Sequence, residues 1–246
     1  MKYIFLLIFI TLTSLNAGDI KIAVAANVSY AIDDLVKEFN KTHPDTEVKV
    51  TLGSSGKLTA QIMHGAPFEL FMSANMKYPN KLYENEIAIT RPVVYAQGSL
   101  AMLSNKNIDF SKGINFLKER KIRRIAVANP KTAPYGKAAF EAFKNAKILQ
   151  DIKKKFIYGE SISQTVSYTI TATDIGIIAK SSLYSPKMAK FKENVNWCEI
   201  DSKLYTPIDQ GIVVLKDSKK VRAFYNFILL NKEAKQIFEK HGYSVL

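Results

Sequence analysis

The chain has 246 residues, of which 47% are hydrophobic, 23% charged and 11% aromatic, as expected for a globular protein of one large or two small domains. This composition excludes a disordered chain, and no apolar run reaches the ~20 residues of a membrane span. The single cysteine, Cys198, excludes an internal disulfide framework and a cysteine-based zinc site. The formal net charge of +13 comes from scattered lysines, densest at Lys153–Lys155 and Lys219-Lys220, so we interpret it as solvated surface rather than a nucleic-acid interface.

The first residues have the pattern of an export signal. Lys2 supplies a positive start, residues 3–12 are almost entirely apolar, and Leu15-Asn16-Ala17 offers a small residue for cleavage. We predict that residues 1–18 are a cleavable signal peptide; a buried strand or a short anchor is the alternative. There is no cysteine at the cleavage site, so no lipid anchor is expected. We expect the remainder, with a net charge one lower, to be free in a bacterial periplasm or secreted.

After this segment, short apolar runs alternate with amphipathic helical patterns. Strands are expected at residues 20–25, 48–52, 68–72, 100–103, 125–128, 174–179 and 211–215. Helices are expected at 32–39, where apolar residues recur at i, i+3, i+4 and i+7, and at 58–64, 138–143, 166–170 and 221–228. This alternation predicts an α/β protein with βαβ units and a mostly parallel sheet.

Four strands are followed by small or polar residues and then by a helix. These loops are residues 25–29, 53–57, 129–136 and 159–163. A helix N-terminus presents free N–H groups and the positive end of a dipole, to which serine and asparagine add donors. Since ligands bind at the carboxyl ends of strands in such sheets, four loops together predict an oxyanion site. In the alternative interpretation, Asn27 and Ser55 merely cap helices and Pro134-Tyr135-Gly136 is an ordinary turn.

Enzyme motifs are incomplete. Residues 53–57 are too short for the phosphate-binding loop of nucleotide-binding proteins. Ser54 and Lys57 match the S-x-x-K pattern of penicillin-recognising enzymes, but the companion motifs are missing. A periplasmic serine hydrolase using this pair therefore stays an alternative. His43, His64 and His241 belong to no metal-binding motif, and we interpret them as surface or loop residues.

Several stretches, in this order, resemble the periplasmic molybdate-binding proteins, the solute receptors of molybdate ABC transporters. They are residues 24–27, 53–58, 65–74, 126–136, 175–178 and 238–243. The resemblance covers nearly all of the chain after residue 18. It implies a two-lobed α/β fold of the type II periplasmic binding proteins, with mixed sheets flanked by helices. We expect lobe 1 to take residues 19–96 and 206–246, and lobe 2 residues 97–205, around a cleft that closes on the anion.

The resemblance also implies a set of ligand-binding residues. The side chains of Asn27 and Ser55 would donate to the oxyanion, and Tyr135 and Ile162 would contribute backbone N–H groups. Further candidates are Ala26, Ser54 and Gly56. Many members carry a tyrosine, whose hydroxyl reaches the ligand, where this chain has Ala179. One donor is therefore missing, or is replaced by the Tyr135 hydroxyl.

The chemistry of the ligand agrees with this donor set. Molybdate at neutral pH is a fully deprotonated dianion, so its site needs only donors, whereas phosphate also wants an acceptor for its proton. A donors-only site requires that Asp33, Asp34 and Glu160, which are near these loops in sequence, point away from it.

We therefore predict a binding protein, not an enzyme, that captures molybdate and tungstate for an ABC importer. No catalytic residue or cofactor is expected, and molybdenum enters only as the bound oxyanion. The expected partners are this anion and a membrane permease, not nucleic acid, and the protein is expected to be a monomer. The alternatives are a receptor for sulfate, phosphate or ferric iron, the serine hydrolase, and an anion sensor that partners a membrane kinase.

Overall fold

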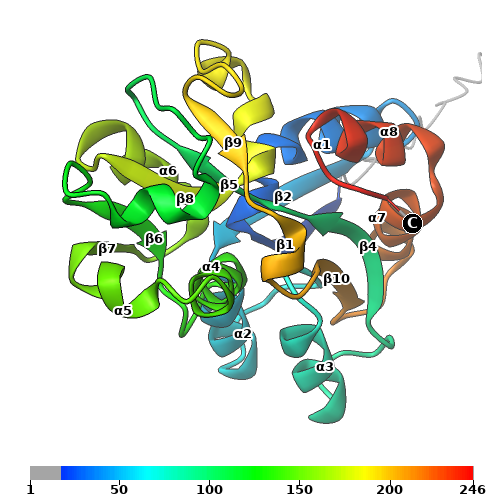
Figure 1. Ribbon diagram of the computed structural model, residues 1–246. Helices are drawn as coiled ribbons and strands as arrows, with labels where there is room; N and C mark the ends of the chain where they lie inside the picture. Colours follow the sequence, from blue (N-terminus) through cyan, green and yellow to red (C-terminus); the bar gives the residue numbers. More distant parts are fainter. Residues whose placement is uncertain (1–17, 246) are drawn as a thin grey trace, which may run out of the picture.

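A computed structural model describes residues 18–245, which form two five-stranded sheets with their helices (Figure 1). The strands of the first sheet, in spatial order, are β2 (Thr46–Gly53), β1 (Gly18–Ala25), β3 (Leu70–Ser73), β10 (Ile208–Val214) and β4 (Val93–Gly98). Those of the second are β7 (Phe156–Gly159), β6 (Ile125–Ala128), β8 (Ile175–Ala179), β5 (Leu100–Leu103) and β9 (Trp197–Glu199). The predicted signal peptide lies outside the described residues except for Gly18, which begins β1.

Helices connect most of the strands. The α-helices are α1 (Ile32–Asn40), α2 (Ser55–Met63), α3 (Lys77–Glu84), α4 (Pro134–Asn145), α5 (Leu149–Ile152), α6 (Ile162–Thr171), α7 (Lys219–Leu230) and α8 (Lys232–Lys240). The 3₁₀ turns are η1 (Ala26–Tyr30), η2 (Gly113–Lys118), η3 (Lys153–Lys155), η4 (Lys180–Tyr184), η5 (Pro186–Met188) and η6 (Ser202–Leu204). All predicted strands and helices are present, whereas β4, β9, α3, α5 and α8 were not predicted, and β7 was implied only by the loop at residues 159–163 that follows it.

Both sheets are mixed, and they share one pattern. In the first, β1 pairs in parallel with β2 and β3, and β10 runs antiparallel between β3 and β4. In the second, β6 pairs in parallel with β7 and β8, and β5 runs antiparallel between β8 and β9. The expectation of mixed sheets is confirmed. Four of the five strands in each sheet run in the same direction, as expected of a mostly parallel sheet, and β10 and β5 are the two strands that run against their neighbours.

Each sheet has its own hydrophobic core. The inner strands β5, β6 and β8 are continuous apolar runs buried along their whole length, as expected of strands covered on both faces. In the first core, Phe39 of α1 meets Phe224 of α7 edge to face, with ring centroids 5.0 Å apart. The second core includes Phe116 and the helix residue Phe143. Figure 1 shows β6, β7 and β8 on the left and β4 and β10, with α7 and α8, on the right.

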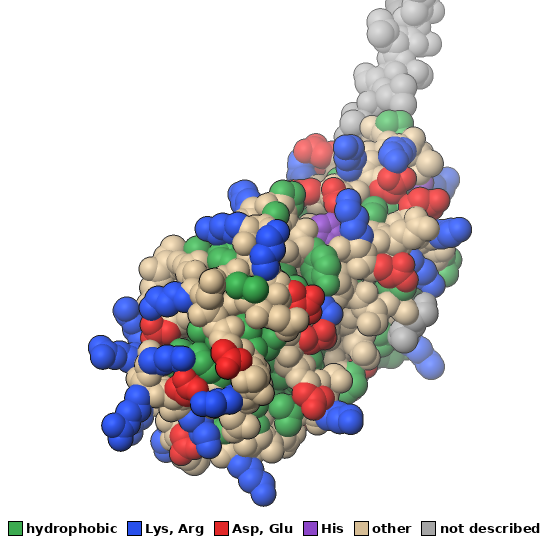
Figure 2. Space-filling model, turned by 45° about the horizontal axis from the view of Figure 1, so that its top comes forward, with side chains coloured by type: hydrophobic (Ala, Val, Ile, Leu, Met, Phe, Trp, Pro, Cys, Tyr) green, Lys and Arg blue, Asp and Glu red, His purple; other side chains and the backbone are tan. Residues whose placement is uncertain are grey.

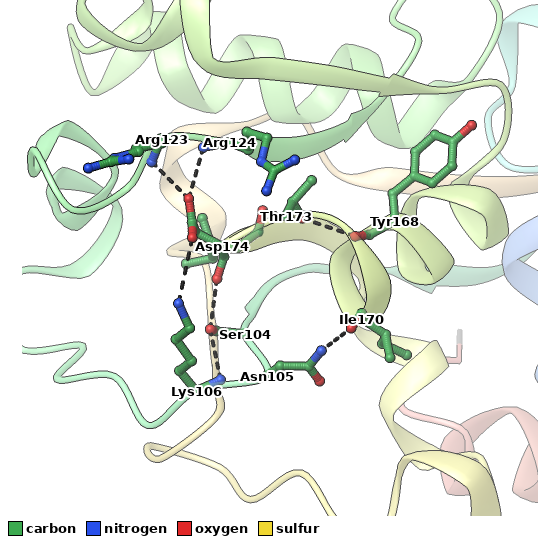
Figure 3. A network of polar contacts seen from close by, with 10 residues as sticks. Ser104, Asn105, Lys106, Arg123, Arg124, Tyr168, Ile170, Thr173 and Asp174 are labelled. Carbon is green, nitrogen blue, oxygen red and sulfur yellow. Dashed lines mark hydrogen bonds and ion pairs between the residues drawn. The ribbon is translucent and has the colours of Figure 1, made fainter.

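A carboxylate joins two strand starts in the second sheet (Figure 3). Asp174, just before β8, accepts hydrogen bonds from the backbone N–H groups of Arg123 and Arg124, just before β6, at 2.9 and 3.0 Å. Its backbone carbonyl accepts a bond from the Ser104 hydroxyl at 2.8 Å. These contacts fix the ends of the strands that lie opposite the loops after β6 and β8.

The charged side chains are spread over the surface, in agreement with the interpretation of the net charge as solvated surface. Figure 2 shows Lys and Arg side chains spread over the visible face with acidic side chains among them. None of the described helices is long and apolar enough to cross a membrane. All three histidines lie outside the helices and strands, as predicted, but His241, in the turn after α8, is buried at 4% exposure. Its Nε2 lies 3.0 Å from Oδ2 of Asp34, so it joins the end of α8 to α1.

Candidate functional site: a small cavity between the sheets

A small cavity lies where the four predicted loops meet. It is lined by Ala25, Ala26, Asn27, Gly53, Ser54, Ser55, Ala74, Ala133, Pro134, Tyr135 and Ile162. Residues 25–27, 53–55 and 74 end or follow strands of the first sheet, and residues 133–135 and 162 follow strands of the second. Six of the seven candidate residues therefore line one cavity. The seventh, Gly56, is not part of its wall.

Two serines of the second loop supply hydroxyl groups. Ser55, the first residue of α2, is fully buried, and its Oγ accepts a hydrogen bond from the Ala74 N–H at 2.9 Å. This leaves the hydroxyl hydrogen of Ser55 able to donate. The buried Ser54 Oγ has no hydrogen-bond partner among the described residues. Ser55 is not a helix cap, and Ser54, at the cap position, makes no capping bond, so the cap interpretation is wrong for this loop.

Two helix starts of the second sheet point backbone donors toward the same place. Tyr135 is the second residue of α4 and Ile162 is the first residue of α6. The N–H groups of a first helical turn have no acceptor within the helix, and the preceding Pro134 has the φ angle that a helix start favours. Ser161 caps α6 by accepting from the Gln164 N–H at 3.2 Å. The capping serine therefore leaves the N–H of Ile162 uncommitted.

The side chain of Asn27 is held by other residues. It lies in η1, is 1% exposed, and its Nδ2 donates to Gln210 Oε1 and Tyr243 Oη, both at 2.8 Å. The buried Oδ1 has no partner among the described residues. Asn27 is thus not a helix cap either. In this orientation its side-chain hydrogens are engaged inside the protein, and the backbone N–H is the donor that Asn27 can offer to a ligand.

Three hydroxyl groups collect around Asn27. Tyr243 Oη donates to the Asn27 carbonyl at 2.9 Å, and Tyr135 Oη lies 3.5 Å from Asn27 Nδ2. Burial raises the pKa of both tyrosines well above the usual value, so both are neutral near pH 7. Ala179 ends β8, and Ser181, two residues later, donates to the same Asn27 carbonyl at 3.1 Å.

The two groups of elements touch along the rim of the cavity. The Gly56 N–H donates to the Thr132 carbonyl at 2.9 Å, so it is engaged across the cleft. Lys57 forms an ion pair with Glu160 across the same gap. Ser163 Oγ donates to the Ala26 carbonyl at 2.8 Å. The structure is therefore a closed arrangement.

The acidic residues near the loops point away from the cavity. Asp33 and Asp34 are exposed on α1, and Glu160 is paired with Lys57. None of the residues that line the cavity carries a charge. Among residues 18–245, no group of three or more His, Cys, Asp or Glu is placed to hold a metal ion.

The S-x-x-K pair is not arranged for catalysis. A lysine activates a serine by accepting its proton, which requires a neutral amine in contact with the hydroxyl. Lys57 is instead half exposed and paired with Glu160, and no described residue is a hydrogen-bond partner of Ser54 Oγ. In this arrangement Lys57 does not activate Ser54 as a nucleophile, which speaks against the hydrolase.

Four polar residues of the site were not predicted as functional: Ser163, Ser181, Gln210 and Tyr243. Ser163 and Tyr243 lie inside stretches that the sequence singles out, but nothing there assigns them a role. Gln210 and Ser181 reach Asn27 from 183 and 154 positions away. Only the folded chain brings them together.

The comparisons with known proteins agree with this architecture. Residues 20–244 match the family model of the bacterial extracellular solute-binding proteins, and the chain belongs to this family. It is therefore a binding protein rather than an enzyme.

The individual proteins to which the chain is similar narrow the comparison further. The chain is 32% identical over 238 residues to the molybdate-binding protein ModA of Azotobacter vinelandii, covering 94% of this chain and 91% of that protein. It is 32% identical to ModA of Rhodobacter capsulatus, covering 92% of this chain and 88% of the relative. The solved periplasmic molybdate-binding protein of Azotobacter vinelandii superposes with a TM-score of 0.82 at 28% identity, covering 92% of this chain and 99% of that one.

Proposed function

We propose that this protein captures molybdate, and also tungstate, in the cavity between the two sheets and delivers it to the membrane permease of an ABC importer. The observation that carries the proposal is the chemistry of the cavity wall, which offers neutral hydrogen-bond donors and no charged side chain. Such a wall suits a dianion that carries no proton. The names of the relatives support the choice of molybdate.

The proposed donors are the hydroxyl of Ser55 and the backbone N–H groups of Asn27, Tyr135 and Ile162. Ser54 Oγ is an additional donor, because it is buried in the same wall without a partner. A buried polar group without a partner costs about 1–3 kcal/mol, and an oxyanion in the cavity removes that cost. No cofactor has a role in this function, because the anion is cargo.

The proposed lobes are residues 19–96 with 206–246, and residues 97–205. The strand positions support this division, since the first sheet takes its strands from residues 18–98 and 208–214 and the second from residues 100–199. We further propose that residues 1–18 are removed on export, and that the protein works as a monomer in the periplasm. Family membership supports a location outside the cytoplasm.

Thermal melting of the chain from residue 19 onward tests the ligand. Molybdate, tungstate, sulfate and phosphate are added in turn, each at a concentration far above the expected Kd. A ligand at 1,000 times its Kd stabilises a protein by about 4.1 kcal/mol, which raises the Tm of a chain of this size by roughly 8–16 °C. Large shifts with molybdate and tungstate alone support the proposal. A larger shift with sulfate or phosphate assigns the site to that anion, and no shift with any of the four refutes an oxyanion receptor.

A further inference from the structure

The segment η1 carries Ala26 and Asn27 of the cavity wall, and hydroxyl groups of the second sheet's helical segments bind its backbone. Ser163, the second residue of α6, donates to the Ala26 carbonyl at 2.8 Å. Ser181, in η4, donates to the Asn27 carbonyl at 3.1 Å. Ser163 Oγ also lies 3.3 Å from Ser29 Oγ. Two consecutive carbonyls of the ligand loop are therefore bound from the opposite side of the cleft.

Neither hydroxyl is part of the cavity wall, so neither is placed to bind the anion. Ser163 follows Ile162 directly, and its contact with η1 is made by the same helix start that brings the Ile162 N–H to the cavity. Separation of the two sheets would break both serine contacts at once, because each bond joins the two groups of elements.

We propose that Ser163 and Ser181, here called the closure serines, stabilise the closed form by binding the η1 carbonyls, and thereby raise affinity without contacting the anion. They are positioning residues rather than ligands. The inference rests on the proposed oxyanion site. It predicts that the hydrogen bonds of these two serines contribute to the affinity through closure. Tyr243 provides the contrast, because it donates to the same Asn27 carbonyl from the core of the first sheet.

The test compares Ser163→Ala, Ser181→Ala and the double variant with the unaltered chain, using sodium molybdate in isothermal titration. The controls are Ser167→Ala, whose Oγ donates within α6 at 3.4 Å, and Ser182→Ala, whose Oγ donates to the nearby Ala179 carbonyl at 2.6 Å. The loss of one hydrogen bond of typical net strength weakens the affinity about two- to tenfold. We expect this loss for each closure serine and a larger one for the double variant, with the ligand-free Tm unchanged. Tyr243→Phe should lower the ligand-free Tm, since its bond lies within one half of the molecule.

A distance measurement separates closure from direct contact. Spin labels at the exposed Gln61 in α2 and Lys153 in η3, in a Cys198→Ser background, report the separation of the two sheets. The double variant should lower the share of short distances, both without ligand and with molybdate at its Kd, and leave the preference for molybdate over sulfate unchanged. An unaltered distance distribution or affinity overturns the proposal, as does a changed preference, which would mean that the serines contact the anion. Failure of the unaltered chain to bind molybdate refutes the proposed function instead, and the ligand-free distances then still decide the role of the closure serines.

Discussion

The side-chain nitrogen of Asn27 donates to Gln210 Oε1 at 2.8 Å, and the opposite end of Gln210 donates to the Ile208 carbonyl at 2.7 Å. The second bond fixes which end of the Gln210 amide is oxygen, since a carbonyl oxygen can only accept and therefore faces the NH2 end of the amide. Gln210 therefore presents an acceptor to Asn27, and Asn27 must present its nitrogen in return. A strand of the first sheet thus determines the orientation of a side chain in the ligand loop.

Replacement of Gln210 by Met should destabilise the protein. Gln210 is fully buried, and its loss leaves the Asn27 nitrogen with one acceptor fewer in a buried place. We expect the free energy of unfolding to fall by about 1–3 kcal/mol, the usual cost of an unsatisfied buried polar group. Urea denaturation measures this change, with the exposed Gln61→Met as the control. Equal stability of the two variants would show that the bond to Asn27 is not needed.

Ser55→Ala should weaken molybdate binding by about 1–3 kcal/mol, since the hydroxyl is a donor to a charged group. Isothermal titration gives the affinity. The variant also loses the acceptor of the Ala74 N–H, so its ligand-free Tm is measured separately and should fall slightly. Ser167→Ala, exposed on α6, is the control for a serine outside the cavity. Unchanged affinity in Ser55→Ala would remove this residue from the site.

Gly56→Ala should impair closure. A Cβ at this position would lie 2.8 Å from the Thr132 carbonyl oxygen and 2.7 Å from the Tyr78 hydroxyl, and backbone at that distance has to move away. Overpacking of this kind costs typically about 1–3 kcal/mol. The clash with Thr132 applies only to the closed form, because Thr132 lies across the cleft, whereas the Tyr78 hydroxyl is the end of a side chain that can turn away. We therefore expect weaker molybdate binding with little change in the ligand-free Tm. A variant that binds as tightly as the unaltered chain would show that Gly56 and Thr132 need not touch.

Asp174 should make stability depend on pH in the acid range. Partial burial raises the pKa of this carboxyl, but the hydrogen bonds from the N–H groups of Arg123 and Arg124 outweigh it, and the pKa lies below the usual value of 3.8. A lowered pKa stabilises the fold above pH 3.8 and loses this contribution as the pH falls through the lower, folded-state value.

We therefore expect Asp174→Asn to have a lower Tm than the unaltered chain at pH 7. The difference should shrink as the pH falls below about 4, because the carboxyl binds its proton first in the unfolded chain and, at a lower pH, in the folded one. Melting curves between pH 3 and 7 measure it, with the exposed Asp33→Asn as the control. A Tm difference that is constant over this range would mean that the charge of Asp174 is not what stabilises the two strand starts in Figure 3.

Local patterns predicted most of the fold because its inner strands and helices have strong periodicity. The run before Asn27 predicts β1, and the spacing of Ile32, Leu35 and Phe39 predicts α1. Strand β9 has only three residues, and β7 is partly exposed, so neither gives a clear apolar signal. Strand direction is set by connections between distant segments, which is why the antiparallel β5 and β10 were not foreseen.

The candidate site was predictable as a set of loops but not as a set of contacts. Ser55, Tyr135 and Ile162 each stand at a helix start, and this local position is visible in the sequence. Which atom of Asn27 faces its neighbours depends on Gln210 and Tyr243, far away in the chain. Periodicity carries no information on such pairs.

The position of β10 between β3 and β4 affects the order in which the two sheets can form during synthesis. Strand β4, made early, has no partner in its sheet other than β10, which begins at Ile208. All strands of the second sheet, by contrast, lie between Leu100 and Glu199 and can pair before the last fifth of the chain exists. Because synthesis begins at the N-terminus, the chain can complete the second sheet first. The first sheet, whose lobe contains Asn27 and Ser55, is complete only after β10 has been synthesised.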